Sequence, residues 1–287
     1  MTESFDPGWL ALREPYDAAA RDPGLAALLA AALPVRPRLI DLGAGAGSLF
    51  RFLAPVIGRD QHWTLADADP ALLDLGLQVT AHWAEANGWQ VSESTGGLAV
   101  ASETGTWRLA PLLIDLREAP RGLPLDRADA VVCTALCDLV SRIWVARLAA
   151  TLHVPFYAAL NVDGRDAFLP ADPADRALAA GFRRDQGRDK GFGRALGPAA
   201  PTTIAGLFRA AGFHVFTAPS DWRVSGRRDL ALAEALIRGH SDAAATVRPA
   251  ARRAAMDWRG RRLRAALAGR LAIRIGHRDI LAIPGRN

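Results

Sequence analysis

The segment 39–53, with the sequence LIDLGAGAGSLFRFL, constrains the fold of this chain more than any other segment. A branched apolar run ends in three glycines at alternate positions, Gly43, Gly45 and Gly47, and helical spacing follows. This pattern predicts a buried strand that turns sharply into a helix, with few side chains in the turn. The free N–H groups of the helix would then face a ligand lying on the turn. A tight turn without a ligand is the alternative explanation of the glycines by themselves.

Three further apolar runs, 62–66, 111–116 and 129–134, predict a second, third and fourth strand. Asp67 directly follows the first of these runs, at the position where an acidic side chain accepts hydrogen bonds from a ribose. Asp69 precedes Pro70 and a helical pattern, so it is predicted to cap the next helix instead. The order and spacing of these strand ends are more specific than the glycines alone.

The glycine turn resembles motif I of the class I S-adenosylmethionine-dependent methyltransferases, and a dinucleotide fingerprint would need a glycine in place of Ser48. The resemblance extends over residues 36–220 and the last strand. It implies that an acidic side chain at Asp115 meets the adenine amino group and that Leu116 lines the ring. Residues expected to contact S-adenosyl-L-methionine are Arg21, Asp41, Gly43, Gly45, Gly47, Asp67, Ala68, Asp115, Leu116 and Thr134.

Two short helices are predicted in the segment 9–33, with a break near 22–24. Methyltransferases of this class often close such a helix over the cofactor, so the resemblance implies that Arg21 meets the methionine carboxylate. A surface ladder of ion pairs with Arg13 and Asp17 is the alternative, because these residues recur at helical intervals.

Seven predicted strands with intervening helices indicate an α/β fold with a doubly wound sheet. The remaining strands are expected at 153–160, 213–218 and 276–284, and a hairpin at 89–102 is expected as an addition to the sheet. The resemblance places the seventh strand antiparallel between the fifth and sixth. We expect one domain, 1–287, with N-terminal helices in 1–35, a cofactor-binding core in 36–161, a cap in 162–201 and a helical insertion in 227–270.

Methyl transfer from a sulfonium is an in-line displacement, which requires a positioned nucleophile and, for an O–H or N–H acceptor, a proton acceptor. In this architecture the substrate faces the carboxyl ends of the fourth and fifth strands. The expected catalytic residues are therefore Asp138, Asn161 and Asp163, with Lys190 reaching in from the cap. Two alternatives remain open: Asp138 as a carboxylate in the first turn of a helix, and Asp163 as part of a tight turn.

The segment 166–201 is rich in charge, glycine and proline, so we expect little sheet character there and a mobile lid over the substrate. The net charge of +5 and eleven arginines between 248 and 286 raise the alternative of nucleic-acid binding. We expect instead an amphipathic helix, with the arginines of 252–264 outside and Leu263 and Leu267 inside.

Function is therefore predicted to be methyl transfer to a small-molecule acceptor. The alternatives are an RNA or protein methyltransferase and a nucleotide-binding or NAD-type protein. No secretion signal or membrane span is apparent, which favours a cytoplasmic location. Cys133 and Cys137 are expected to be reduced thiols without a metal, and the sequence leaves the oligomeric state open.

Overall fold

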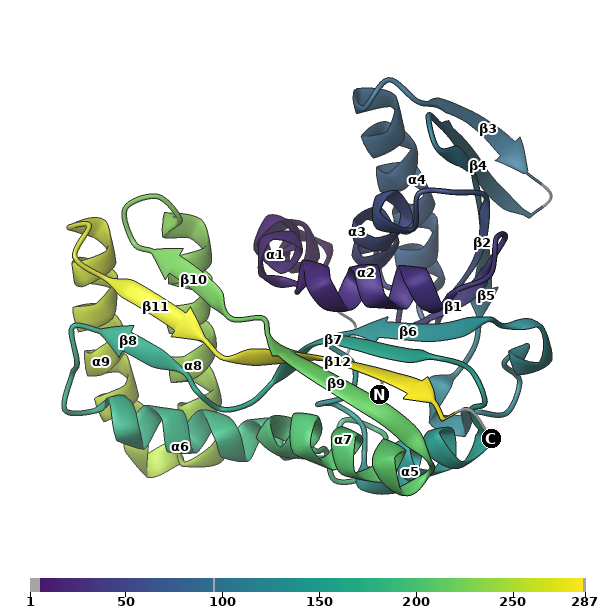
Figure 1. Ribbon diagram of the computed structural model, residues 1–287. Coiled ribbons are helices and arrows are strands. Elements are labelled where there is room, and N and C mark those ends of the chain that lie inside the picture. Colours follow the sequence, from purple (N-terminus) through teal and green to yellow (C-terminus); the bar gives the residue numbers. More distant parts are fainter. Residues whose placement is uncertain (1–5, 95, 286–287) are drawn as a thin grey trace.

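The apolar runs of the sequence assemble into one mixed sheet in the computed structural model, which describes residues 6–94 and 96–285 (Figure 1). Within these residues the sheet has nine strands in the order β3-β4-β5-β2-β1-β6-β7-β12-β9. Their bounds are β1 (Arg38–Leu42), β2 (Gln61–Asp67), β3 (Gln90–Ser94), β4 (Gly97–Ser102), β5 (Gly105–Leu113), β6 (Ala130–Thr134), β7 (Phe156–Val162), β9 (Phe213–Pro219) and β12 (His277–Pro284).

The last strand, β12, lies antiparallel between β7 and β9, as the methyltransferase resemblance implies. The expected total of seven strands is wrong, because the hairpin β3–β4 joins the sheet by antiparallel pairing with β5. This pairing exists because β5 begins at Gly105, well before the expected start at Pro111. The hairpin thereby covers the edge of β5 that would otherwise be unpaired. Thr95, in the turn of that hairpin, lies outside the described residues.

Helices cover both faces of the main sheet, because successive side chains of β1 point to opposite faces. Leu39 packs with α2, α3 and α4, whereas Ile40 packs with α5 and α7. The bounds of the helices around this sheet are α1 (Pro7–Ala20), α2 (Pro23–Ala32), α3 (Ser48–Ile57), α4 (Pro70–Ala86), α5 (Arg142–Thr151) and α7 (Ala200–Ala210).

A second, smaller lobe lies on the left of Figure 1 and contains a three-stranded sheet in the order β10-β11-β8. Its elements are β8 (Ala167–Leu169), β10 (Trp222–Ser225), β11 (Ala272–Ile275), α6 (Asp175–Gln186), α8 (Leu230–Val247) and α9 (Arg252–Leu267). The lobe has its own core, in which Phe168, Leu232 and Trp258 are buried. Its strands are too short to show a two-residue period, so the sequence did not reveal them.

The expected arrangement of helix α9 is wrong at two positions. Leu267 is 65% exposed, whereas Arg262 is only 3% exposed. Arg262 is buried because it joins α9 to the segment 170–175. Its Nη1 donates to the Pro170 carbonyl at 2.6 Å, and its Nη2 pairs with Asp175. Trp258 also fixes Asp175, because its Nε1 donates to Oδ1 at 2.7 Å. The arginines of α9 are therefore partly structural.

None of the helices in the described part of the chain has the length and apolar character needed to cross a bilayer.

Candidate functional site

The glycine turn between β1 and α3 has a backbone that other residues adopt only with strain. Gly43, Gly45 and Gly47 have φ angles of 66°, 51° and 79°. Gly47 occupies the N-cap position of α3 and provides no side-chain hydrogen bond to the first turn. The N-terminus of α3 is therefore open toward whatever lies above the turn.

A cavity of about 280 Å³, here termed the strand-end cavity, opens at this turn and at the carboxyl ends of β2 and β6. Eight of the residues expected at the site line it: Gly43, Gly45, Asp67, Ala68, Asp115, Leu116, Thr134 and Lys190. Six others do not line it: Arg21, Asp41, Gly47, Asp138, Asn161 and Asp163. The structure thus brings the strand-end residues together and places most of the expected catalytic residues outside the cavity wall.

Asp67 and Asp69 have different local partners, and the cap predicted at Asp69 is confirmed. Asp67 Oδ2 accepts a hydrogen bond of 2.8 Å from the Gly45 N–H and so links the end of β2 to the glycine turn. Asp69 is the N-cap of α4 and accepts from the Ala71 and Leu72 N–H groups at 2.9 and 3.4 Å. Both carboxylates line the cavity, and Asp67 is the one that holds the backbone of the glycine turn.

Asp41 is completely buried beneath the turn, and neither oxygen of its carboxylate has a hydrogen-bond partner among the described residues. Burial raises its pKa to about 8, although the positive charge on Arg21 lowers it. Arg21 is itself 2% exposed and donates to Ser48 and Thr134, while its Nε has no partner within the described chain. A buried carboxyl and a buried guanidinium therefore keep polar atoms without partners in the described chain, and the charge on Arg21 acts on Asp41.

Asp115 has a partner that the sequence did not indicate. It lies beyond the end of β5, accepts from the Arg117 N–H at 2.9 Å and forms an ion pair with the Arg117 side chain. This guanidinium lowers the pKa of Asp115. Leu116 is buried, and its carbonyl accepts from Trp144 Nε1 at 2.7 Å.

Asp138 is not in the first turn of a helix, so that alternative is wrong. Helix α5 begins at Arg142 with Ser141 as its N-cap, and Asp138 lies in the preceding loop. Its Oδ1 is buried without a hydrogen-bond partner in the described chain. Burial raises the pKa of Asp138 to about 6, while its own backbone N–H and the charges on Arg13 and Lys190 lower it. Lys190 Nζ lies 4.0 Å from Asp185 Oδ2.

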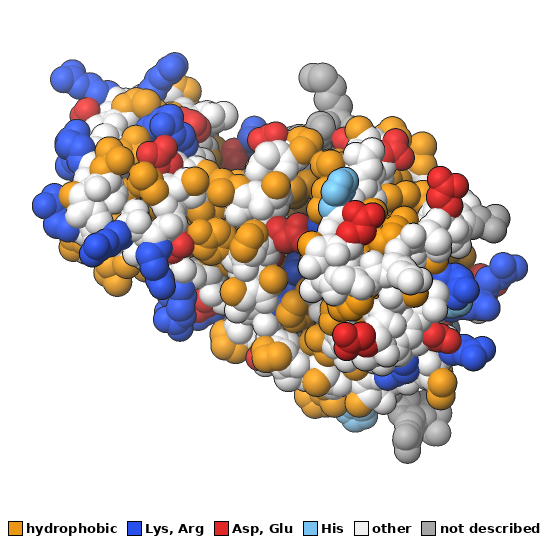
Figure 2. Space-filling model, turned by 90° about the horizontal axis from the view of Figure 1, so that it is seen from above, with side chains coloured by type: hydrophobic (Ala, Val, Ile, Leu, Met, Phe, Trp, Pro, Cys, Tyr) orange, Lys and Arg blue, Asp and Glu red, His pale blue; other side chains and the backbone are white. Residues whose placement is uncertain are grey.

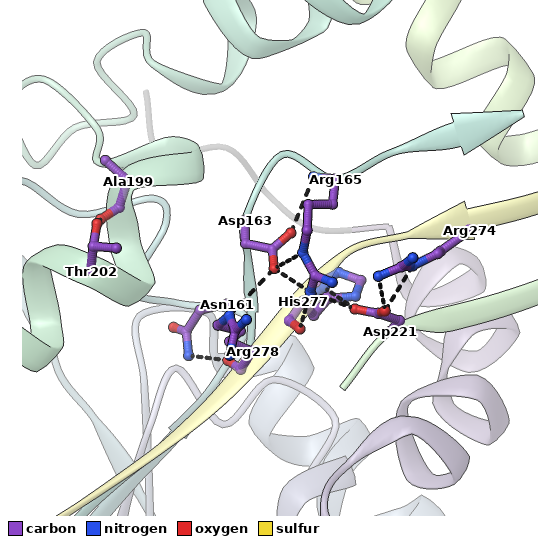
Figure 3. A network of polar contacts seen from close by, with 9 residues as sticks. All are labelled: Asn161, Asp163, Arg165, Ala199, Thr202, Asp221, Arg274, His277 and Arg278. Carbon is purple, nitrogen blue, oxygen red and sulfur yellow. Dashed lines mark hydrogen bonds and ion pairs between the residues drawn. The ribbon is translucent and has the colours of Figure 1, made fainter. Parts of the chain in front are cut away.

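Asn161 and Asp163 belong to a different polar network, near the junction of the two lobes (Figure 3). Asn161 is fully buried and donates to the carbonyls of Ala158 and Arg278 at 2.8 and 3.0 Å. Asp163 pairs with Arg165, which also reaches Asp221 at 2.9 Å. These contacts fix the end of β7 against β12.

Helix α1 supplies a wall of the strand-end cavity, whereas the sequence indicated only Arg21 as a site residue from the N-terminal helices. Leu10, Arg13, Glu14 and Asp17 line the cavity from this helix. Two contacts fix its position: Glu14 pairs with Arg51 of α3 at 2.6 Å, and Asp17 accepts from Trp222 Nε1 of β10 at 3.0 Å. Within the helix, Arg13 Nε donates to Asp17 at 2.9 Å. The helical spacing of Arg13 and Asp17 was the available signal, but it also fits a surface ladder.

No family model matches this sequence. No curated protein matches it either.

Several solved structures are similar to this chain. The YcgJ protein of Bacillus subtilis is 13% identical, with 93% of this chain and 100% of that chain covered and a TM-score of 0.46. The cyclopropane synthase MmaA2 of Mycobacterium tuberculosis is 12% identical, with 90% and 83% covered and a TM-score of 0.42. Human N-acetylserotonin methyltransferase, solved in complex with SAM, is 16% identical, with 73% and 49% covered and a TM-score of 0.39.

The surface charge is uneven between the two lobes. Lys and Arg side chains gather along the outer edge of the second lobe, on the left of Figure 2. Several of the arginines there have carboxylate partners, including Arg259 with Asp242 and Arg261 with Asp172. This partial neutralisation reduces the attraction of the lobe for a polyanion.

Proposed function

We propose that this protein transfers a methyl group from S-adenosyl-L-methionine to a small-molecule acceptor. The observation that carries the proposal is the strand-end cavity, in which an open helix N-terminus and Asp67 lie above the buried residues Asp41 and Arg21. Each of these features matches one part of a cofactor that contains a ribose and a zwitterionic amino acid.

The unpartnered side chains test whether the cofactor fits. A methionine moiety carries an ammonium and a carboxylate, which need a buried acid and a buried base. Asp41 and Arg21 have unsatisfied polar atoms of these two kinds. A buried polar group without a partner costs about 1–3 kcal/mol. Neither residue lines the cavity, but each adjoins a residue that does: Asp41 lies two residues before Gly43, and Arg21 donates to Thr134.

The remaining contacts follow from the cavity wall. Asp67 would accept hydrogen bonds from the ribose hydroxyls, and Leu116 would pack against the adenine ring. Asp115 is paired with Arg117, so we assign the two together to the adenine edge. Ala68, Gly43 and the turn provide backbone groups without obstructing side chains.

The cofactor supplies an electrophilic methyl group on a positively charged sulfur. The chain must hold an acceptor in line with that methyl group and accept a proton if the acceptor is an acid O–H or N–H. Asp138 is our candidate for the proton acceptor, because its pKa of about 6 leaves it ionised at neutral pH. It lies between Leu136 and Leu139, which both line the cavity.

Lys190 is the candidate for orienting the acceptor, because it lines the cavity and comes from the loop after α6. Asn161 and Asp163 we assign to the architecture instead. Their side chains are engaged with β12 and Arg165, away from the cavity lining.

Thermal unfolding with S-adenosylhomocysteine and with NAD tests the proposal. At a hundredfold excess over its dissociation constant a ligand adds about 2.7 kcal/mol of stability, which gives a measurable rise in Tm. We expect the rise with S-adenosylhomocysteine and none with NAD. The opposite result would overturn the proposal in favour of a nucleotide-binding protein.

Two glycine variants control for strain. Gly45→Ala places a side chain in the cavity at a φ of 51°, so we expect it to abolish the ligand-induced rise. Gly88→Ala introduces comparable strain at a φ of 77°, but a Cβ there meets nothing within 4 Å. It should lower the Tm without ligand and leave the ligand-induced rise intact.

A further inference from the structure

A second hollow, of about 830 Å³, adjoins the strand-end cavity and is termed the arginine groove. It is bounded by the first turns of α5, the C-terminal end of α6 and residues between 187 and 199. Arg117 and Phe192 line both hollows. A ligand in the groove would therefore lie next to one in the cavity.

Five arginines line the groove and are here termed its rim. They are Arg117, Arg142, Arg147, Arg183 and Arg194, and no carboxylate side chain of the described residues lines the groove. Arg117 is paired with Asp115, whereas the other four form no ion pair with a carboxylate of the described residues. Like charges gathered in one hollow repel each other, and an anion placed among them relieves that repulsion.

Two acidic residues at and after the C-terminal end of α6, Asp185 and Asp189, are engaged elsewhere. Asp185 pairs with Arg188 at 2.6 Å and lies 4.0 Å from the Lys190 ammonium. Asp189 Oδ1 accepts from the N–H groups of Gly191 and Gly193, which shapes the loop around Phe192. These carboxylates therefore leave the charge on the rim uncompensated.

Apolar side chains also line the groove and are here termed its floor. Ile143 is 64% exposed there, and Phe192 makes an edge contact with Trp144 at 6.2 Å between ring centroids. Leu196 and Pro198 complete the floor. An apolar floor within a charged rim matches a ligand that has an apolar body and anionic groups.

Backbone hydrogen bonds hold the wall between the groove and the cavity. Leu196 N–H donates to the Val140 carbonyl at 2.9 Å, and Gly197 N–H donates to the Asp138 carbonyl at 2.8 Å. The loop that carries Asp138 is thus shared by both hollows.

We propose that the arginine groove binds an anionic amphiphile, a small molecule with phosphate or carboxylate groups on an apolar body. This rests on the proposed function in one respect: the amphiphile is the distal part of the methyl acceptor, whose reactive end passes Phe192 into the strand-end cavity. The volume of the groove lies within the range of small-molecule sites. A nucleic-acid strand would instead need an extended track of cations along its backbone.

Calorimetric titration with dodecyl phosphate and with dodecanoate, both below their micelle concentrations, tests the site and distinguishes the two anionic groups. Dodecyltrimethylammonium is the cationic control with the same chain. We expect the anionic probes to bind and the cationic one not to bind. Absence of binding by both anions overturns the proposal, as does equal binding of the cation.

The double variant Arg147→Glu/Arg183→Glu reverses the rim charge, and Arg252→Glu/Arg253→Glu on exposed positions of α9 makes the same change of net charge outside the groove. We expect at least a tenfold weaker binding of the anionic probe in the groove variant and unchanged binding in the control. Equal losses in both would mean diffuse electrostatic attraction and would overturn the site. Tighter binding of a ten-residue oligouridylate, lost in the groove variant, would replace the proposal with a nucleic-acid site.

S-adenosylhomocysteine binding by the same variants separates the two proposals. If the wild-type chain binds dodecyl phosphate in the groove but not S-adenosylhomocysteine, the proposed function fails and the groove remains. If it binds only S-adenosylhomocysteine, the groove alone fails. For an acceptor found by S-adenosylhomocysteine release, the groove variant should raise KM about tenfold at unchanged kcat, and an unchanged KM overturns the link to the acceptor.

Discussion

Arg21 donates a hydrogen bond of 3.2 Å from Nη2 to Thr134 Oγ1, which joins the end of α1 to the carboxyl end of β6. The same guanidinium acts on the pKa of Asp41, below the glycine turn. Arg21 therefore links the end of α1 to β6 and also influences Asp41 of β1. Because the pKa of Asp41 lies near neutral pH, we expect cofactor binding and stability to depend on pH.

Cofactor binding should release protons near neutral pH. The pKa of Asp41 is about 8, so this carboxyl is largely protonated in the free protein at pH 7. A ligand ammonium placed beside it favours the ionised form and displaces the proton. Titrations with S-adenosylhomocysteine at pH 7, in buffers of different ionisation enthalpy, should show this release. It should vanish in Asp41→Asn, and equal release from that variant would assign the proton to another group.

Removal of the Asp41 charge should also change the dependence of stability on pH. Its folded pKa lies above the usual value of 3.8, so the folded state holds the proton more tightly than the unfolded state. Stability from this group is fully present below about pH 4 and is lost as pH rises through about 8. Urea unfolding of the wild type should therefore show a decline over this window that Asp41→Asn lacks.

Methyl transfer should depend on the ionisation of Asp138. With a pKa of about 6, its carboxylate becomes available as pH rises from 5 to 7, so the rate should rise over that interval. Asp138→Asn should remove this limb of the profile and lower kcat by about 10²–10⁴-fold. Asp163→Asn is the comparison, because Asp163 pairs with Arg165 in a separate network, whereas Leu136 and Leu139 of the Asp138 loop line the cavity, so this variant should leave the limb in place. A limb that persists in Asp138→Asn would exclude it as the proton acceptor.

Substitution of Asp67 should affect cofactor binding, whereas substitution of Asp69 should affect stability. Asp67→Ala should weaken S-adenosylhomocysteine binding by about 1.5–3 kcal/mol, the range for hydrogen bonds to a charged group. Asp69→Ala removes the cap of α4 and should lower the free energy of unfolding by about 1 kcal/mol while affinity stays the same. Calorimetric titration beside thermal unfolding measures both effects. Similar losses of affinity would contradict the division of roles.

Trypsin should cleave the loop after α6 before it cleaves α6 itself. Arg188 and Lys190 lie in the irregular segment beyond Gln186, whereas Arg183 and Arg184 are within the helix. Helix α6 packs closely on α8, since a Cβ at Gly181 would lie 2.8 Å from the Ala244 Cβ. We therefore expect the mobile lid to consist of the loop after α6 and not of the whole segment 166–201. First cleavage at Arg183 or Arg184 would place the opening in the helix instead.

Arg262 should matter for stability and Arg264 should not. Arg262→Met removes the charged hydrogen bonds to Asp175 and the Pro170 carbonyl, so the free energy of unfolding should fall by about 1.5–3 kcal/mol. Arg264 is exposed, and Arg264→Met should change it by less than about 0.5 kcal/mol. Equal effects in urea unfolding would show that the buried arginine adds no more than a surface one.

The sequence by itself determined the parts of this protein that depend on neighbouring residues. The glycine turn, the cap at Asp69 and the break at Asp22 are confirmed, because a positive φ or a capping hydrogen bond is a local requirement. The first, second and fourth predicted strands are also confirmed as β1, β2 and β6, since each is a run of apolar residues long enough to recognise. The strands of the second lobe were not, because three or four residues carry too little periodicity.

Only the tertiary structure decided the electrostatics of the site. Whether Asp41 is exposed or buried, whether Asp115 faces a ligand or Arg117, and whether Arg262 faces water or Asp175 all depend on residues distant along the chain. A charged side chain has the same sequence signature in each case. Its energy is set by the partners and the solvent that packing leaves around it, and these exist only once the lobes are assembled.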